Sequence, residues 1–235
     1  MITAMIVFLA LPETKPKTQA GEKEKTMMQT IGGYGQVFRD KLFITLLILA
    51  IISTIVYVQM NTTLSVFLRD IHNIPPQGYG YILSLNAVMI VLFQFLVTQK
   101  IKSHPPLILI ATGTLLYAIG FGMYGFVSTF TLFLFAMVII TIGEMIIAPI
   151  GQSIIADLAP EHMRGRYMAA FGINWGLSYA FGPLMAGIII DKFNPNWIWY
   201  IGGILCGLSA IGYILLQLRA GERFKPLSIV TSPDS

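Results

Sequence analysis

The chain has 235 residues and a formal net charge of +4, and 55% of its residues are hydrophobic whereas only 11% are charged. Soluble domains carry about 25% charged residues, and a soluble chain with so few would expose large apolar patches. The composition therefore excludes an ordinary soluble enzyme, a disordered tail and a disulfide scaffold, and it leaves the membrane-protein class.

Two segments precede the first complete membrane span. Residues 1–11 are apolar and look like the last turns of a membrane helix, but they are too short to cross a bilayer alone. We therefore expect them to be the remnant of a preceding transmembrane helix. Residues 12–41 are mostly polar, with several Lys and Glu side chains, and we expect them to form a cytoplasmic linker.

Five long runs with almost no charged residues follow. They cover residues 42–68, 73–99, 105–156, 167–190 and 193–218, and Glu144 is the only charged residue within them. A helix crosses a bilayer with about 20 apolar residues, so the third run holds two helices, separated at residues 125–131. Transmembrane β-strands need only about ten residues of alternating polarity, whereas these runs are apolar on every side. The sequence therefore predicts an all-α membrane protein with six transmembrane helices in one bundle over residues 42–219.

The positions of the basic residues predict the orientation of this bundle. Of the fifteen Lys and Arg residues, all except Arg69 and Lys192 lie before the first span, after the last span, or in the loops near residues 100 and 165. Cytoplasmic loops carry an excess of Lys and Arg. We therefore expect both termini, including a tail over residues 220–235, to lie in the cytoplasm, with the protein in the plasma membrane. This distribution indicates topology and not binding to nucleic acid.

Three motifs resemble those of a known transporter family. The motifs are Leu11-Pro12-Glu13-Thr14, the stretch from Gly143-Glu144 through Pro149 to residues 156–168, and Gly182-Pro183-Leu184-Met185-Ala186-Gly187. Together they make the whole chain similar to the C-terminal half of a major facilitator superfamily transporter, nearest to the drug:proton antiporter branch.

This resemblance implies both a fold and a function. The fold is one six-helix bundle built from two inverted three-helix repeats, which pair the first three spans with the last three. The segment 12–41 then links two bundles, and Gly182, Pro183 and Gly187 form a structural motif. The implied function is proton-coupled efflux of small amphipathic compounds by alternating access, with a complementary N-terminal six-helix half as partner.

The sequence also leaves alternatives to that function. Six spans cannot form a two-bundle pathway alone, so the chain could be a split half that acts only with a partner, or a non-transporting remnant. An intramembrane enzyme would need several His, Asp or Glu residues at membrane depth, and the spans contain only Glu144. No phosphate-binding Gly-Lys-Ser/Thr loop occurs, and the three His residues and the single Cys are dispersed. We therefore expect no catalytic residues, no cofactor and no metal site.

Glu144 is the candidate for proton coupling. A charge at the middle of a bilayer costs about 2.5–3.5 kcal/mol on insertion scales, and ionisable groups at that depth are functional by default. A carboxyl group that gains and loses a proton as access alternates would couple protons to transport. The alternative is a structural Glu that is protonated or hydrogen-bonded between helices.

Polar residues at helical spacing predict a cavity, because a polar stripe in lipid should face protein or water. The candidates for lining it are Thr54, Tyr57 and Asn61 in the first span, Asn86 and Gln94 in the second, Thr141 and Gln152 in the fourth, and Asn174, Trp175 and Ser178 in the fifth. Interhelical hydrogen bonding is the alternative role for each. Pro149 frees a helical carbonyl, which favours a kink beside the cavity.

Charged residues between the fourth and fifth spans form a second candidate site. Asp157, Glu161, Arg164 and Arg166 could make a cytoplasmic gate, or they could serve only topology and helix capping.

Small residues recur at close spacing in three spans, and we expect them to let helices pack closely. They are Gly113, Gly120, Gly122 and Gly125 in the third span, Gly172, Gly176 and Ala180 in the fifth, and Gly203 and Gly207 in the sixth.

Overall fold

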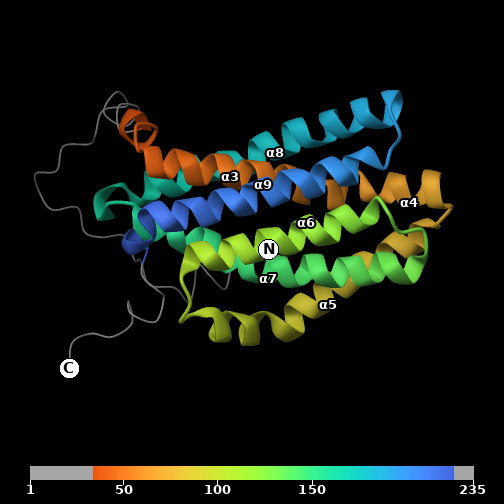
Figure 1. Cartoon of the computed structure of the whole chain (residues 1–235), viewed down its shortest axis with the longest axis horizontal. Helices are drawn as coiled ribbons and strands as arrows, with labels where there is room; N and C mark the ends of the chain where they lie inside the picture. Colours follow the sequence, from red (N-terminus) through yellow and green to blue (C-terminus); the bar gives the residue numbers. More distant parts are fainter. Residues whose placement is uncertain (1–33, 225–235) are drawn as a thin grey trace, which may run out of the picture.

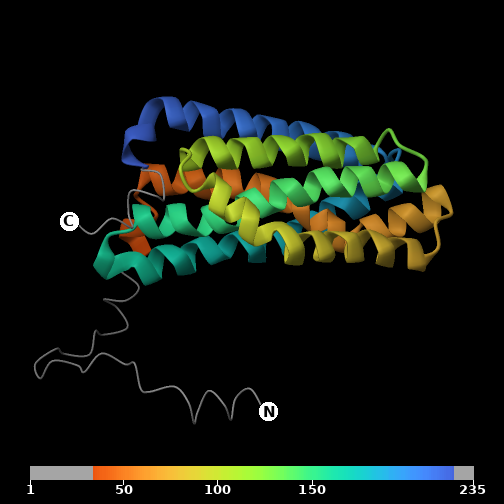
Figure 2. The same cartoon turned by 90° about the horizontal axis from the view of Figure 1, so that it is seen from below.

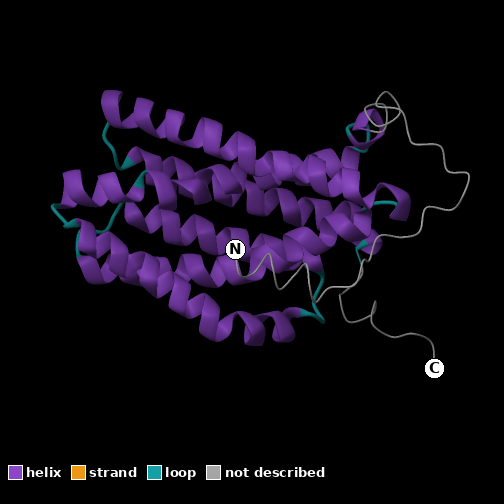
Figure 3. Cartoon of the chain, turned by 180° about the vertical axis from the view of Figure 1, so that it is seen from behind, coloured by secondary structure: helices purple, strands orange, loops and turns teal. Residues whose placement is uncertain are grey.

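The computed structural model describes residues 34–224, which form helices joined by short loops and contain no strand (Figures 1 and 3). The helices are α3 (Lys41–Thr62), α4 (Leu64–His72), α5 (Pro76–Ile101), α6 (Pro106–Tyr124), α7 (Phe130–Leu158), α8 (Arg164–Lys192) and α9 (Trp197–Ala220), with 3-10 turns at Glu161–Met163 and Gly221–Arg223. All except α4 are long and apolar enough to cross a membrane, which confirms the six predicted spans. The expected helix remnant over 1–11, most of the linker and most of the tail lie outside the described residues.

Local signals in the sequence explain several helix ends. Asp40 caps α3, because its Oδ1 accepts hydrogen bonds from the backbone N–H groups of Leu42 and Phe43 at 2.9 and 3.2 Å. Helix α5 starts with a proline in its first turn, where a missing N–H leaves no helical hydrogen bond unmade. Helix α4 ends at Asn73, which adopts the left-handed conformation with a φ of 54°.

The first predicted span is not one continuous helix, and here the expectation was wrong. Instead of a single helix over 42–68, α3 ends at Thr62 and α4 starts at Leu64. The hydroxyl of Thr63 donates to the Gln59 side-chain oxygen. Short polar side chains compete in this way with the helical hydrogen bonds, which explains the break after Asn61, Thr62 and Thr63.

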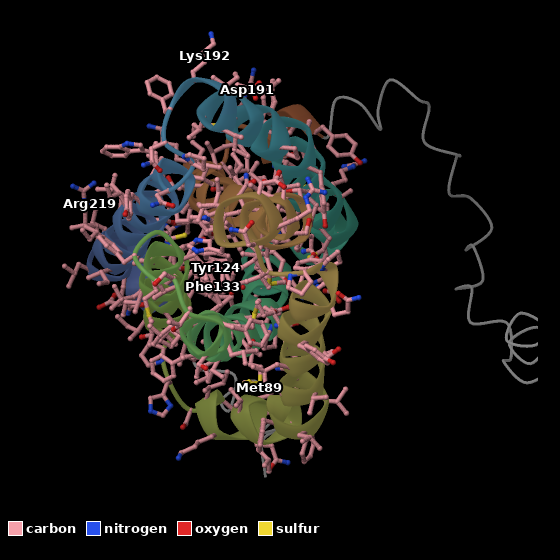
Figure 4. The ribbon with its side chains drawn as sticks, turned by 90° about the vertical axis from the view of Figure 1, so that its right-hand side faces the viewer. Met89, Tyr124, Phe133, Asp191, Lys192 and Arg219 are labelled. Carbon is pink, nitrogen blue, oxygen red and sulfur yellow. The ribbon has the colours of Figure 1, made fainter. Side chains whose placement is uncertain are left out.

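The packing of the helices follows the predicted division into three plus three. Helix α3 packs mainly against α8 and α9, whereas α7 packs against α5 and α6, and α6 packs along α9. The first helix of each set of three therefore lies against the second and third helices of the other set. Figure 2 shows α6 running along α9, and Figures 1 and 4 show α5 and α8 at opposite edges of the bundle.

Glycines explain how closely α6 approaches its two neighbours. A Cβ on Gly113 would lie 2.9 Å from the backbone oxygen of Gly143 in α7, and one on Gly203 of α9 would lie 3.1 Å from the Cα of Gly122. A larger side chain at either position would force the helices apart. The packing predicted for the third span, and for Gly203 in the sixth, is therefore confirmed.

The same expectation was wrong for Gly172, Gly176 and Gly207. A Cβ at any of these positions would meet no atom within 4 Å in the described part of the chain. The reason is that these residues lie on the sides of α8 and α9 that face away from the other helices.

Two cores lie at opposite ends of the bundle. At the end where α3 begins and α9 finishes, which we call the basic end, the core includes Phe43, Leu107, Ile150 and Tyr167. At the end that carries α4, which we call the α4 end, aromatic side chains dominate, among them Phe67, Phe121, Tyr124, Phe133 and Trp199. Glu144 lies between these two cores along α7.

Candidate functional site

Helix α7 places Glu144 between α3 and α5, where two of the predicted cavity residues contact it and a third, Thr141, joins the network through Asn86. The Tyr57 hydroxyl donates to Glu144 Oε1 at 2.7 Å, and Asn86 Nδ2 donates to Glu144 Oε2 at 2.8 Å. Asn86 Nδ2 also donates to Thr141 Oγ1 at 3.1 Å, and the Thr141 hydroxyl donates to the backbone oxygen of Met137. Asn86 and Thr141 are buried, so this network fixes the position of the carboxyl group.

The network is built to accept a negative charge. Both oxygens of Glu144 accept hydrogen bonds, and hydrogen bonds to an ionised carboxylate are roughly twice as strong as those between neutral groups. A proton on either oxygen would occupy an acceptor position and remove the charge that strengthens both contacts. The arrangement around Glu144 is therefore sensitive to whether the carboxyl group carries a proton.

A second polar contact joins α3 to α8 beside the first. Asn174 Nδ2 donates to Thr54 Oγ1 at 3.0 Å, and the Ser178 hydroxyl lies 3.5 Å from Asn174 Oδ1. Trp175, the next residue on α8, is 46% exposed and meets the ring of Tyr57 edge-on at 5.9 Å between centroids. Tyr57 thus connects the Glu144 network to the aromatic surface of α8.

Two adjoining cavities lie along these residues. The larger has a volume of about 310 Å³ and the smaller, which reaches Glu144, about 100 Å³. Both are lined by Ser53, Thr54, Ile147, Ala148 and Trp175. The larger cavity adds Gln152 and Asn174 as amides and Met168, Phe171 and Tyr213 among its apolar and aromatic walls. A mainly apolar pocket with a few polar groups is the usual form of a small-molecule site.

Five of the ten predicted cavity residues do not line either cavity: Asn61, Asn86, Gln94, Thr141 and Ser178. Three of them, Asn86, Thr141 and Ser178, are buried between helices and serve in hydrogen bonds instead. Asn61 is exposed near the end of α3. Gln94 Nε2 donates to the backbone oxygen of Met145 and to Thr98 Oγ1, each at 3.0 Å. The Met145 oxygen is the carbonyl that Pro149, four residues later and without an N–H, cannot bond. Gln94 therefore supports the α7 backbone at the proline.

The predicted gate residues lie where α7 ends and α8 begins. They are Asp157, Glu161, Arg164 and Arg166. Arg164 Nε donates to the backbone oxygen of Ala156 at 3.0 Å, which is a capping contact at the end of α7. Within residues 34–224 the one ion pair joins Arg69 to Asp70, so the four charges are not paired with one another there. A gate at this position stays a prediction.

Only Gly182 of the predicted Gly-Pro motif makes a close interhelical approach. A Cβ on Gly182 would lie 3.0 Å from Gln59 Nε2, so glycine lets α8 come close to α3 near the α3–α4 break. Pro183 is half-buried, and a Cβ on Gly187 would meet no described atom within 4 Å.

Several cavity residues were not found from the sequence. Tyr117 of α6 lines the smaller cavity and stacks on Tyr57 at 5.7 Å between ring centroids. Tyr213 of α9 lines the larger one. The cavity candidates came from the first, second, fourth and fifth spans only, so residues of the third and sixth spans were missed. In the part of the chain that the structure describes, no group of His, Cys, Asp and Glu residues could hold a metal ion.

Comparison with known proteins places the chain among transporters. The family model described as Major Facilitator Superfamily matches residues 1–183 and 59–230. The MFS-type transporter YhjO of Bacillus subtilis is 29% identical over 213 residues, which cover 88% of this chain and 49% of that protein. A Na(+), Li(+), K(+)/H(+) antiporter of Planococcus maritimus is 24% identical, over 80% of this chain and 47% of its own length. The chain thus spans about half the length of these relatives.

A solved structure agrees with the fold. A POT family transporter crystallised with a thioalcohol-conjugated peptide superposes with a TM-score of 0.70 at 18% identity. The match covers 81% of this chain and 45% of that one. At this identity the similarity shows the fold alone, and it extends over about half of the POT family transporter.

Proposed function

The chain belongs to the major facilitator superfamily, a family of membrane transporters and not of enzymes, and we propose that it forms one half of a proton-coupled exporter of small amphipathic compounds. The observation that carries this proposal is the position of Glu144. It is the only acidic residue inside the apolar runs, it accepts hydrogen bonds from Tyr57 and Asn86, and it borders a cavity. Proton uptake and compound binding would therefore act on the same group of residues.

The walls of the cavity support the proposed class of compound. A metal cation needs several oxygen ligands at short distance, and a volume of about 310 Å³ is far larger than such a site. Phe171, Trp175 and Tyr213 offer flat apolar surfaces, while Gln152 and Asn174 offer amide groups. This combination suits a molecule with an apolar body and one or two polar groups.

The chemistry proposed for Glu144 is a proton exchange. When the carboxyl group is ionised, Tyr57 and Asn86 hold it in place beside the adjoining cavity. When it takes a proton, both hydrogen bonds weaken. Transport follows if only one of these states binds the compound well, because a ligand shifts an equilibrium only by its differential affinity. The relative from Planococcus maritimus, whose name gives it as a cation/H(+) antiporter, supports a role for protons.

The location and partner of the chain are part of the same proposal. The protein is integral to a membrane, and the gathering of Lys and Arg at the basic end favours the cytoplasmic side of the plasma membrane for that end. Since the relatives are about twice as long, we propose that a complementary six-helix half completes the pathway. A split half that acts only with this partner is one form of the proposal, and the second candidate function is a remnant that transports nothing even in the partner's presence.

One reconstitution tests the function and its alternative together. The chain is placed in acid-loaded vesicles with and without the complementary half, and proton efflux is followed when an amphipathic fluorescent dye is added outside. We expect dye-driven proton efflux only when both halves are present, and its loss in Glu144→Gln. Glu222→Gln, which removes an exposed carboxylate outside the spans, serves as the matched control. Proton exchange that survives Glu144→Gln would falsify the role of Glu144, and no exchange with both halves would identify a remnant.

A further inference from the structure

Helix α5 is attached to the bundle differently from its neighbours. Over its 26 residues only Gly78, Ile82 and Asn86 are buried, whereas α6 and α7 each bury long rows of apolar side chains. Its packing partner along most of its length is α7, and it lies at the edge of the bundle, where Figure 4 labels Met89. Because α5 buries so little, specific hydrogen bonds make up a large share of its attachment.

Two amide side chains on one face of α5 supply its hydrogen bonds to α7, and the Tyr79 hydroxyl adds one to the backbone oxygen of Met60 in α3 at 3.2 Å. Asn86 and Gln94 are eight residues apart, slightly more than two helical turns, so they face the same neighbour. Asn86 donates to the carboxylate of Glu144 at 2.8 Å, and Gln94 donates to the backbone oxygen of Met145 at 3.0 Å. The two contacts therefore hold adjacent residues of α7, one through a side chain and the other through the backbone.

The Gln94 contact exists because of Pro149. A carbonyl in a helix normally accepts from the N–H four residues later, and proline has none. An unpaired carbonyl inside a membrane is costly, so an amide from a neighbouring helix is stabilising there. This contact contains no titratable group, and it should persist whether or not Glu144 carries a proton.

The Asn86 contact depends on the charge of Glu144. An amide donates strongly to a carboxylate and more weakly to a neutral carboxylic acid. The titratable side chains that face Glu144 from the other packed helices are Tyr57 of α3 and Tyr117 of α6. On the side of α8 the neighbour is Trp175, which does not titrate. No Lys, Arg, His or Asp lines the cavity beside it, so the carboxyl group itself is the one that changes charge.

We propose that Asn86 and Gln94 form a two-point clamp between α5 and α7. Proton uptake by Glu144 weakens the Asn86 contact, which keeps only its neutral hydrogen bond to Thr141, while Gln94 remains as the pivot. Helix α5 then swings about the Gln94–Met145 contact at the proline of α7. Gln94 is thus a positioning residue for Glu144 and not part of the cavity wall. The inference rests on the proposed proton uptake by Glu144, and it adds the helix movement that this uptake controls.

Spin labels measure the swing in the full chain. The labels are placed at Tyr81→Cys on α5, which is 64% exposed and far from the Gln94 pivot, and at Leu208→Cys on α9, which is 59% exposed, in a Cys206→Ala background in lipid nanodiscs. On acidification we expect the population with α5 swung out, seen as a second distance between the labels, to increase roughly threefold. This factor corresponds to the loss of one typical interhelical hydrogen bond in a bilayer. Glu144→Gln and Asn86→Leu should each show that distance at every pH. A distance distribution that does not change with pH in the unmodified network overturns the clamp.

A double-mutant cycle tests the Gln94 pivot. Gln94→Leu leaves the Met145 carbonyl unpaired, so we expect roughly a threefold change in the two distance populations. In a Pro149→Ala background the N–H of residue 149 can bond that carbonyl, and the same Gln94→Leu change should then have little effect. Equal effects in both backgrounds would show that Gln94 does not act through the proline-freed carbonyl. If Gln94→Leu alone fails to fold, recovery of folding by Pro149→Ala supports the pivot and no recovery contradicts it.

The outcomes separate this inference from the proposed function. If α5 keeps one distance at all pH values while Glu144→Gln still abolishes proton exchange in vesicles, the clamp is wrong and the transport proposal stands. If the α5 distance responds to pH through Glu144 but proton exchange is unaffected by Glu144→Gln, the clamp stands and the role of Glu144 in transport is wrong.

Discussion

At the α4 end the rings of Phe121, Tyr124, Phe133 and Trp199 lie with neighbouring centroids 5.1 to 6.4 Å apart, whereas toward the basic end a cavity of about 310 Å³ lies among α3, α7 and α8. Helices α6, α7 and α9 contribute side chains to both regions. The difference is that large flat side chains fill the first, while Ala148, Gly151 and short hydroxyl residues border the second. Glu144 is reached from the open region, and the packed region supports it from the other side.

The comparison indicates which end is rigid and which end can change. Interiors packed with rings transmit strain and resist rearrangement. A cavity with polar groups at its edge leaves room for a compound and for movement of side chains. If this is correct, equivalent substitutions at the two ends should affect different properties: stability at the α4 end and transport near the cavity.

The largest difference is expected for the removal of a phenyl ring at each end. Phe133 is fully buried among rings, so Phe133→Ala should lower the free energy of unfolding by about 3–5 kcal/mol. Phe171 borders the cavity, where an empty space already exists, and Phe171→Ala should cost much less while changing dye affinity in the two-half assay. Denaturant titration of the two variants in detergent measures both losses of stability. Equal losses of stability would show that the two ends do not differ in packing.

The removal of one hydroxyl group from each region should change stability in opposite directions. The Tyr124 hydroxyl is buried and has no hydrogen-bond partner among the described residues, so Tyr124→Phe should leave stability unchanged or raise it by about 1 kcal/mol. The Tyr57 hydroxyl donates to Glu144, so Tyr57→Phe should lower the free energy of unfolding by about 1.5–3 kcal/mol, as for hydrogen bonds to charged groups. The same titration compares them, at a pH where Glu144 is ionised. Destabilisation by Tyr124→Phe would reveal a partner outside the described residues.

The sequence predicted much of this arrangement because helical spacing and membrane cost are local properties. The apolar runs predicted the six spans, and spacing of three and four residues placed Thr141 and Glu144 on one face of α7. Which helices meet that face depends on tertiary packing, so Tyr117 of α6 was missed. Gln94 was assigned to the cavity for the same reason, since only the packed structure shows its contact with the carbonyl that Pro149 leaves free.

The smallest expected effect concerns pH at the α4 end. His72 lies outside the membrane-spanning helices, at the end of α4, with its ring 4.9 Å from those of Phe67 and Phe133. Burial lowers the pKa of His72 below its ordinary value of 6.5. A histidine with a lowered pKa binds a proton less readily in the folded chain than in the unfolded chain. Stability is therefore unaffected above about pH 6.5 and falls as the pH drops below that value.

The change should stay well under about 1 kcal/mol because the side chain is partly exposed to solvent. Unfolding titrations of the wild type and of His72→Gln at neutral and acidic pH measure it, with His104→Gln, an exposed histidine at the basic end, as the matched control. Loss of the acid-dependent part of the destabilisation in His72→Gln alone is the expected result. If His104→Gln removes it equally, the aromatic packing at the α4 end is not what suppresses the charge on His72.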